Sequence, residues 1–350
     1  MTTYVLGAGA SLNAGYPLAK TMATDLLRWM KRPTHDPDSY AGRYPATAHF
    51  FEESFAPVEN VEDLVTAIYK LIGEYENGTR EQRARRALIA NEYGVLKNAV
   101  CAWFAEIRQG EALTSSAYQD FARNIVVPGD CIITFNYDVS LERELRKAGR
   151  FEVGDGYGFP IEGLPGKSDT KVLKLHGSTS WLALLFGGMT SGFFKSQPGS
   201  TLSERPVIAK NELSFLGYAD AVDRRFGKGG AALPVMIFPA RSKEFYFATN
   251  TGIEYAEFWD DLWRQAKKAL ESAARIVICG YSLLSVDERA RKHLLNAPKK
   301  DAEIVVASGE DTGRIVGDYR EAGYARAVAA DEVFFQKWVA SFASSVAGTR

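Results

Sequence analysis

The chain has 350 residues, of which 46% are hydrophobic and 24% are charged, and its formal net charge is −1. That balance is typical of a soluble globular protein with one large domain or two, and the near-zero charge excludes a general attraction to nucleic acid or anionic membranes. The first residues predict a strand rather than a signal sequence, and no run of about 18 apolar residues occurs, so we expect a cytoplasmic protein with no membrane partner.

The first predicted element is a strand over residues 3–6, which enters the turn Gly7-Ala8-Gly9-Ala10-Ser11 and is followed by a helix over residues 18–30. Such units bind phosphate, because glycine lets the backbone approach closely and a helix N-terminus favours negative charge. The dinucleotide fingerprint needs a third Gly or Ala where this chain has Leu12, and an acid about 20 residues further on, where only Asp25 inside the helix is near. The turn is therefore Rossmann-like but lacks the usual signature of a dehydrogenase.

Residues 31–125 are predicted to form a helical insertion. Its first part, residues 31–60, contains several Pro and Gly residues and predicts irregular structure. Asn60 is a plausible N-cap, with Asp63 at the third position, and apolar residues then recur at helical spacing over residues 60–75. Two more helices are predicted over residues 79–109 and 116–124.

A second strand, turn and helix unit begins at residues 131–135, which lead into Asn136-Tyr137-Asp138 and a helix over residues 139–148. A third strand, residues 171–175, ends at His176-Gly177. We expect residues 178–245 to form a small variable lobe with short strands at 206–209 and 235–238. After a helix over residues 253–274, strands at 275–279, 303–307 and 324–329 alternate with helices and make residues 275–345 the C-terminal part of the sheet.

Strands that alternate with helices predict an α/β fold with a Rossmann-like, doubly wound parallel sheet, and we expect residues 1–350 to form a single catalytic domain. Ligands bind such sheets at the carboxyl ends of the strands, where the strand order reverses. The segments predicted at those ends are glycine-rich or polar, and they are Gly7-Ala8-Gly9-Ala10-Ser11, Asn136-Tyr137-Asp138, His176-Gly177-Ser178, Gly280-Tyr281-Ser282 and Ser308-Gly309-Glu310.

The chain contains four histidines, and His176 is the one that ends an apolar strand. His35 and His49 lie in the segment predicted to be irregular, and His293 lies on a predicted helix beside Lys292. We therefore expect these three at the surface. Only His176 lies where a ligand is expected.

The three cysteines, Cys101, Cys131 and Cys279, are far apart in the sequence and lie in apolar runs. None belongs to a C-x-x-C pair, which excludes a four-cysteine zinc module and gives no disulfide framework. We expect three buried thiols and no metal site.

Four motifs follow predicted strands in chain order: GAGAS with GYP, TFNYD, KLHGS and CGYSL. In this order they resemble the sirtuin superfamily, and specifically its bacterial sirtuin-like branch that cleaves NAD⁺. The resemblance extends from Thr3 to about Glu310. Residues 60–109 and 178–240 contribute no motif to it.

The resemblance implies a role for each matching residue. Asn136 and His176 would be catalytic, and Asp138 would line the nicotinamide-ribose pocket with Asn136. The other residues implied in binding NAD⁺ are Gly7, Ala8, Gly9 and Ser11 at the pyrophosphate and nearby ribose, Gly280, Ser282 and Ser308 at the adenosine half, and Pro17 in a loop over the nicotinamide half.

The residue types agree with that chemistry, because cleavage of the nicotinamide–ribose bond builds positive charge on the ribose and needs positioning, a polar amide and a base. Protein-deacylating sirtuins carry Asp-Phe-Arg where this chain has Leu18-Ala19-Lys20, and a zinc module where it has no cysteine between Cys131 and Cys279. We therefore expect water to be the acceptor and NAD⁺ to be hydrolysed to nicotinamide and ADP-ribose. In the branch that the chain resembles, this reaction depletes NAD⁺ during phage infection and stops the host.

An enzyme that depletes NAD⁺ is toxic to its host if it is always active. We therefore expect its activity to be controlled by homo-oligomerisation or by a partner protein. The resemblance suggests a HerA-type ATPase or a short argonaute as that partner. Two other functions stay open: a protein deacylase or ADP-ribosyltransferase, against which the missing zinc module counts, and a module that senses NAD or a related nucleotide without turnover. Asn136 and His176 favour the enzyme, since a module that only binds has no need of both.

Overall fold

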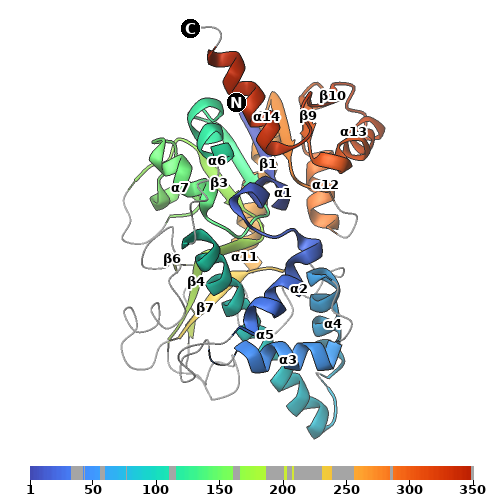
Figure 1. Ribbon diagram of the computed structural model, residues 1–350. Coiled ribbons are helices and arrows are strands. Elements are labelled where there is room, and N and C mark those ends of the chain that lie inside the picture. Colours follow the sequence, from blue (N-terminus) through green and yellow to red (C-terminus); the bar gives the residue numbers. More distant parts are fainter. Residues whose placement is uncertain are drawn as a thin grey trace. The chain divides into compact units, whose positions relative to one another are not determined.

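The computed structural model describes residues 1–32, 42, 44–55, 60–75, 77–109, 116–160, 166–186, 201–202, 207–208, 231–238, 256–283 and 287–347 (Figure 1). The chain folds into two compact units. The first comprises residues 1–16, 110–177 and 257–350, and the second comprises residues 17–109 and 178–256. Most of the predicted helical insertion and all of the predicted variable lobe fall in the second unit.

The first unit contains a six-stranded sheet in the order β10-β9-β8-β1-β2-β3, and every neighbouring pair is parallel. If these six strands are numbered 1 to 6 along the chain, their order in the sheet, read from β3 to β10, is 3-2-1-4-5-6. This is the strand order of the Rossmann fold, so the predicted doubly wound parallel α/β fold is confirmed. The order reverses between β1 and β8. The strands are β1 (Thr2–Leu6), β2 (Cys131–Thr134), β3 (Lys171–Lys174), β8 (Arg275–Cys279), β9 (Glu303–Ala307) and β10 (Ala327–Ala329).

Helices cover both faces of this sheet, as two adjacent residues of β1 show. The Tyr4 ring packs edge-on against Phe121 at 5.0 Å, whereas the Thr3 hydroxyl donates to the carbonyl oxygen of Ala269 at 3.2 Å. Adjacent side chains of a strand point to opposite faces, so the elements that carry Phe121 and Ala269 lie on opposite sides. Because both faces are covered, the strands β2, β8 and β9 read as nearly continuous apolar runs rather than as alternating patterns.

The helical elements of the first unit are α1 (Ala8–Ser11), the 3₁₀ turn η1 (Leu12–Ala14), α6 (Ser116–Asp120), the π-helical turn η3 (Phe121–Ile125), α7 (Ser140–Lys147), α8 (Val153–Gly156), α11 (Ala256–Ser272), α12 (Glu288–Asn296), the 3₁₀ turn η4 (Gly309–Asp311), α13 (Thr312–Glu321) and α14 (Phe335–Ala347). The C-terminal helix α14 packs against α6 and η3, with Phe335 in contact with the rings of Tyr118 and Phe121.

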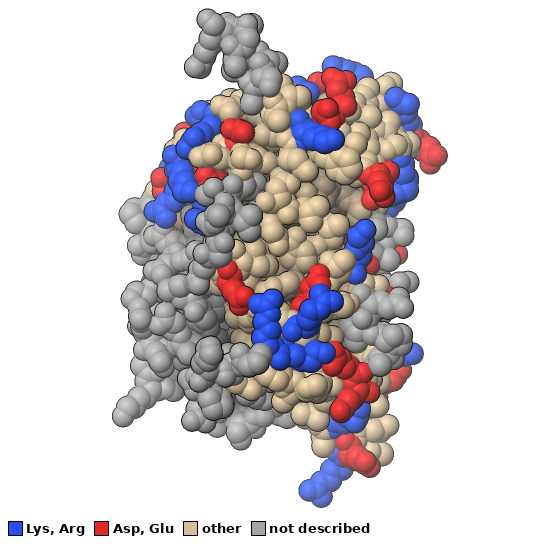
Figure 2. Space-filling view, in the orientation of Figure 1, with Lys and Arg blue, Asp and Glu red and all other residues tan. Residues whose placement is uncertain are grey.

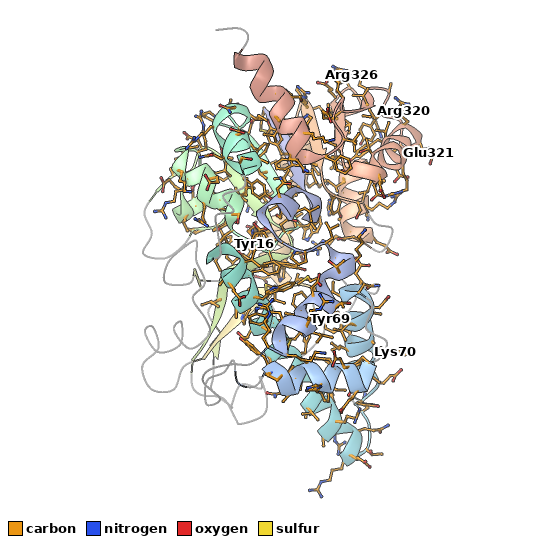
Figure 3. All side chains as sticks on the ribbon, in the orientation of Figure 1. Tyr16, Tyr69, Lys70, Arg320, Glu321 and Arg326 are labelled. Atoms are coloured by element: carbon orange, nitrogen blue, oxygen red, sulfur yellow. The ribbon has the colours of Figure 1, made fainter. Side chains whose placement is uncertain are left out.

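The second unit combines a helical cluster with a small antiparallel sheet. Its buried tyrosines Tyr69 and Tyr93 share a hydrogen bond of 2.9 Å between their hydroxyls (Tyr69 is labelled in Figure 3). Asn60 caps its helix as predicted, since its side-chain oxygen accepts from the backbone N–H of Asp63. The elements are α2 (Ala19–Met30), α3 (Tyr44–Phe55), α4 (Val61–Glu74), α5 (Arg80–Gln109), β4 (Gly177–Phe186), β5 (Thr201–Leu202), β6 (Val207–Ile208) and β7 (Ala231–Met236).

Two features of the second unit differ from the sequence predictions. The segment predicted to be irregular contains the helix α3, because Pro45 falls in its first turn, where the missing N–H breaks no helical hydrogen bond. In the lobe, the long strand β4 was not predicted. The strand β6 lies within the expected range 206–209, whereas β7 begins four residues before the expected range 235–238 and overlaps it at residues 235 and 236 only. His35 lies outside the described residues.

The described surface carries charges of both signs. On the face drawn in Figure 2, Lys and Arg side chains lie among Asp and Glu side chains. In the part of the chain that the structure describes, no helix has both the length and the apolar character needed to cross a bilayer. The thiols of Cys101, Cys131 and Cys279 are buried and free, as predicted.

Candidate functional site

The turns that follow β1 and β8 interlock at the point where the strand order reverses. The N–H of Gly7 donates to the carbonyl oxygen of Cys279 at 3.0 Å, and the N–H of Gly9 donates to that of Gly280 at 2.9 Å. A Cβ on Gly9 would lie 2.8 Å from the Cα of Gly280, and a Cβ on Gly280, whose φ is +59°, would lie 2.3 Å from the backbone nitrogen of Ala10. These glycines therefore allow two backbones to touch, and their predicted contact with a pyrophosphate stays a prediction.

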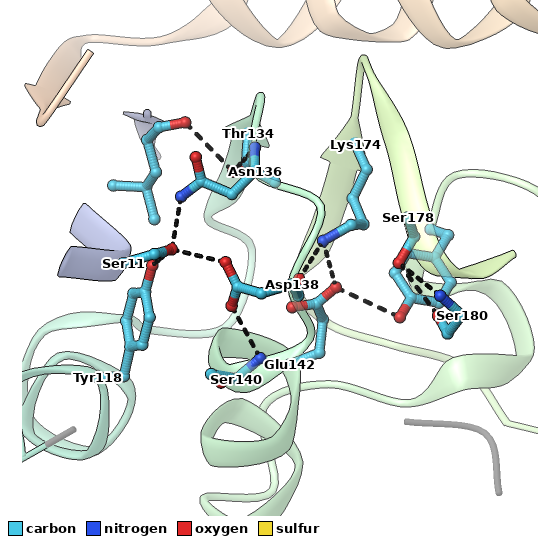
Figure 4. A network of polar contacts seen from close by, with 12 residues as sticks. Ser11, Tyr118, Thr134, Asn136, Asp138, Ser140, Glu142, Lys174, Ser178 and Ser180 are labelled. Atoms are coloured by element: carbon cyan, nitrogen blue, oxygen red, sulfur yellow. Dashed lines mark hydrogen bonds and ion pairs between the residues drawn. The ribbon is translucent and has the colours of Figure 1, made fainter. Parts of the chain in front are cut away.

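Ser11 is the centre of a buried polar network beside this turn (Figure 4). Its hydroxyl lies 2.6 Å from Oδ2 of Asp138, 2.9 Å from Nδ2 of Asn136 and 2.7 Å from the hydroxyl of Tyr118. A serine hydroxyl has one proton and two lone pairs. Because a carboxylate only accepts, the proton goes to Asp138, and the lone pairs accept from Asn136 and Tyr118. All three hydrogen-bonding positions of Ser11 are filled by the protein.

The network fixes the direction of the Asn136 side chain. Its Nδ2 donates to Ser11 and also to the carbonyl oxygen of Gly7 at 2.9 Å. Both amide protons are therefore donated within the protein, and Oδ1 is the atom that can accept a hydrogen bond from a ligand. Asp138 is held in a similar way, since its Oδ1 accepts from the backbone N–H of Ser140 at the start of α7.

Tyr118 is a permanent donor to Ser11. Burial, together with the nearby Asp138 carboxylate, holds the pKa of Tyr118 well above its ordinary value, so the phenol stays protonated throughout the neutral range. Its ring packs on Phe335 of α14. Tyr118 therefore connects Phe335 of the C-terminal helix to the Ser11 hydroxyl, which contacts Asn136 and Asp138.

A buried ion pair supports the same loop from β3. Lys174 Nζ lies 2.9 Å from Oε1 of Glu142 on α7, and each of these side chains is 1% exposed. The ammonium also donates to the backbone carbonyl oxygen of Asp138 at 2.6 Å (Figure 4). Burial raises the pKa of Glu142, and the adjacent Lys174 ammonium opposes that rise. Lys174 at the end of β3 therefore contacts both Glu142 of α7 and the backbone of Asp138.

His176 follows β3, on the strand neighbouring the one that leads to Asn136. Thr134 and Lys174 are in register, and the N–H of Leu175 donates to the carbonyl oxygen of Thr134. The imidazole is nearly buried, with the Phe135 ring edge-on at 5.0 Å, and Phe135 in turn stacks on Tyr281 at 4.3 Å. Nε2 of His176 lies 3.3 Å from Oδ2 of Asp287, which precedes α12.

Of the residues singled out in the sequence, Ser11, Asn136 and Asp138 contact one another, and the backbones of Gly7 and Gly9 contact the turn after β8. Gly7, Ala8, Gly9, Ser11, Asn136, Asp138, His176, Gly280, Ser282 and Ser308 all belong to the first unit, whereas Pro17 belongs to the second. The carbonyl oxygen of Ser282 accepts from the Arg314 guanidinium. The hydroxyl of Ser308, directly after β9, is buried and has no hydrogen-bond partner among the described residues. A polar ligand at this strand end would satisfy it.

The other histidines differ from His176 in their surroundings. His49 is exposed, as predicted, and lies 3.8 Å from a carboxylate oxygen of Glu52. His293 was expected at the surface but is half-buried, because its ring stacks on Trp263 at 5.1 Å. Among the described residues, no three His, Cys, Asp or Glu side chains gather as metal ligands.

Sequence reasoning missed four residues of this site: Tyr118, Glu142, Lys174 and Asp287. Lys174 gave a signal, since it is a charged residue within an apolar strand, and such a residue needs a buried partner. Asp287 gave a weaker one as the N-cap of a predicted helix. Nothing in the spacing of Tyr118 distinguishes it from an ordinary core tyrosine.

Ser11→Ala is expected to weaken both stability and the site, because it leaves three buried polar groups without their common partner. We expect a loss of about 1–3 kcal/mol in the free energy of unfolding, measured by urea titration. Tyr118→Phe is the matched control, since it removes one donor and keeps Ser11, and it should cost about 0.5–1.5 kcal/mol. Equal stability of Ser11→Ala and the unmodified protein would contradict the central position of Ser11.

Comparisons with known proteins add a likeness in fold. No protein-family model matches the chain, and no curated protein matches it. Solved structures that match include a Sir2 enzyme studied for mechanism and regulation (13% identity, TM-score 0.41, covering 100% of this chain and 93% of that one). A Sir2 homologue in complex with NAD matches with 13% identity and a TM-score of 0.39, covering 99% of this chain and 90% of that one. Sir2Tm bound to a propionylated peptide matches with 12% identity and a TM-score of 0.39, covering 99% of this chain and 93% of that one.

Proposed function

We propose that this protein is an NAD⁺ glycohydrolase that converts NAD⁺ and water to nicotinamide, ADP-ribose and a proton. The observation that carries the proposal is the placement of a buried amide and a buried imidazole, Asn136 and His176, after adjacent strands of a sheet in Rossmann order. Nucleotides bind at this edge of such sheets. The motifs that contain the two residues resemble those of sirtuin-like proteins that cleave NAD⁺.

The arrangement suits cleavage of an N-glycosidic bond. As nicotinamide leaves with the bonding electron pair, the ribose gains positive charge, which fixed dipoles and carboxylates stabilise better than mobile water does. Oδ1 of Asn136 is oriented to accept from a ribose hydroxyl or the attacking water, and Asp138 supplies negative charge 2.6 Å from Ser11. His176 accepts the proton that water loses when its oxygen bonds to the ribose.

We propose further that the reaction serves antiphage defence by depleting NAD⁺. An enzyme of this kind harms its own host when it is always active, so its activity is gated by homo-oligomerisation or by a partner protein. A HerA-type ATPase and a short argonaute are the candidates that the sequence resemblance suggests.

The test is incubation of the purified protein with NAD⁺, alone and together with the product of the neighbouring gene, followed by chromatography of the products. We expect nicotinamide and ADP-ribose to appear in equal amounts in at least one condition. NADH is the matched control substrate, because its reduced ring lacks the positive charge that makes nicotinamide a good leaving group. It should not be cleaved.

Other outcomes would contradict the proposal in distinct ways. Binding of NAD⁺ without release of nicotinamide in either condition would favour a nucleotide-sensing module. Release that depends on an added acyl-lysine peptide, with transfer of the acyl group to ADP-ribose, would favour a deacylase.

A further inference from the structure

Asp287 is a buried carboxylate that contacts two elements at once. Its Oδ1 accepts the backbone N–H of Ala290 at 3.1 Å and so caps the N-terminus of α12. Its Oδ2 lies 3.3 Å from Nε2 of His176, and the two side chains are 9% and 11% exposed. Each oxygen of the carboxylate therefore has a separate partner.

The helix that carries Asp287 contacts α11 through the side chain of Arg289. Arg289 pairs with Asp260 of α11 at 2.7 Å, and its guanidinium lies over the Trp263 ring at 5.1 Å. Because Asp287 caps this helix through Oδ1, the start of α12 restrains the direction in which Oδ2 points.

The surroundings of the pair strengthen it. The Phe135 ring lies edge-on to His176, and Phe135 stacks on Tyr281 with an interplanar angle of 10°. These rings keep bulk water from one side of the imidazole, and a hydrogen bond to a carboxylate is stronger where water does not screen it.

The chemistry of a carboxylate decides which nitrogen of His176 carries the proton. An ionised carboxylate only accepts hydrogen bonds, so the nitrogen that faces it, Nε2, must be the protonated one. In neutral imidazole the lone pair then lies on Nδ1. The contact with Asp287 sets this tautomer in the absence of a substrate.

We propose that Asp287 is a positioning residue for His176: it fixes the Nε2-protonated tautomer and the ring direction, so that Nδ1 is the atom that accepts the proton. The role of Nδ1 as proton acceptor rests on the proposed function. In that step an O–H bond of water breaks, an N–H bond forms at Nδ1, and the water oxygen bonds to the ribose. Asp287 stabilises the resulting imidazolium, which later gives the proton to solvent.

The variant Asp287→Asn tests the inference while preserving the fold. Asparagine caps helices about as well as aspartate does, so Oδ1 can still accept from Ala290. The amide nitrogen would then face Nε2, two donors would meet, and the ring proton would move to Nδ1. We expect kcat for nicotinamide release to fall by roughly 10²- to 10⁴-fold with KM for NAD⁺ unchanged, the scale seen where a carboxylate–histidine pair acquires the wrong tautomer.

The matched control is Asp260→Asn, which removes the exposed ion pair between α11 and α12 and leaves Asp287 in place. It should lower kcat by less than about tenfold, because an exposed ion pair contributes little. A loss in Asp260→Asn as large as that in Asp287→Asn would mean that α12 acts only as a support, and would overturn the inference.

A spectroscopic measurement separates this inference from the proposed function. With ¹⁵N-labelled histidine, the four imidazoles give separate nitrogen signals, and His176 is assigned by its loss in His176→Gln. We expect the Nε2-protonated form in the unmodified protein and the Nδ1-protonated form in Asp287→Asn.

Protonation of Nδ1 in the unmodified protein would overturn the inference, even if Asp287→Asn did not fold. A protein that shows the Nε2-protonated form but cleaves no NAD⁺ would contradict the proposed function and leave the role of Asp287 supported.

Discussion

Nicotinamide release is expected to fall to background, by roughly 10²- to 10⁴-fold, in His176→Ala and in Asn136→Ala, while both variants stay folded. His176→Ala removes the proton acceptor. Asn136→Ala removes Oδ1, the ligand-facing acceptor, and leaves Ser11 and Gly7 without the amide donor that they share. Release is measured by chromatography, and folding by circular dichroism and thermal unfolding.

Each variant has a matched control on an exposed residue of the same type. His49→Ala and Asn124→Ala remove an exposed imidazole and an exposed amide, and both should release nicotinamide at the unmodified rate. Calorimetry with NAD⁺ shows whether binding survives the loss of chemistry. Activity that persists in both folded site variants would refute the assignment of Asn136 and His176.

Lys174→Ala is expected to cost about 3–5 kcal/mol in the free energy of unfolding, because it leaves Glu142 as an uncompensated buried charge. Oε2 of Glu142 already has no hydrogen-bond partner among the described residues, so the carboxylate depends on its Oε1 contacts with Lys174 and Tyr157. The loss of Lys174 also removes the donor to the Asp138 carbonyl. Urea unfolding measures the change.

Two comparisons decide whether the cost comes from the unpaired charge. The double variant Lys174→Met with Glu142→Leu should recover most of the stability, since apolar residues of similar volume replace buried ion pairs at little cost. Lys267→Ala on α11 breaks a pair with Glu271 in which both side chains are about half exposed, and it should cost less than about 1 kcal/mol. A cost for Lys174→Ala no larger than that for Lys267→Ala would refute the argument.

The sheet and the residues at its carboxyl edge could be predicted because their signals are local. Each strand is a short apolar run, and Gly7, Asn136, His176 and Gly280 follow such runs directly. In a parallel sheet those positions converge whatever the connections are. The sequence could therefore place these residues on one edge without the order of the strands.

The residues that support the site could not be predicted, because their roles depend on contacts between distant segments. Tyr118 reaches Ser11 across 107 positions, and Lys174 reaches the Asp138 carbonyl across 36. A contact between such distant residues leaves no periodic pattern of apolar residues in the sequence. The helix α3 was missed for a different reason, since Pro45 is compatible with a first helical turn although it breaks helices elsewhere.

The position of β1 has a consequence for the time at which the site can form during synthesis. Leu6 pairs with Thr134 on one side and with Cys279 on the other, so the strand made first lies between partners made much later. At ribosomal rates, the interval between Leu6 and Asp287 is roughly 15–60 s. Until β8 and Asp287 emerge, the Gly7 turn has no partner turn and His176 has no carboxylate. A nascent chain is therefore without the complete site for most of its synthesis.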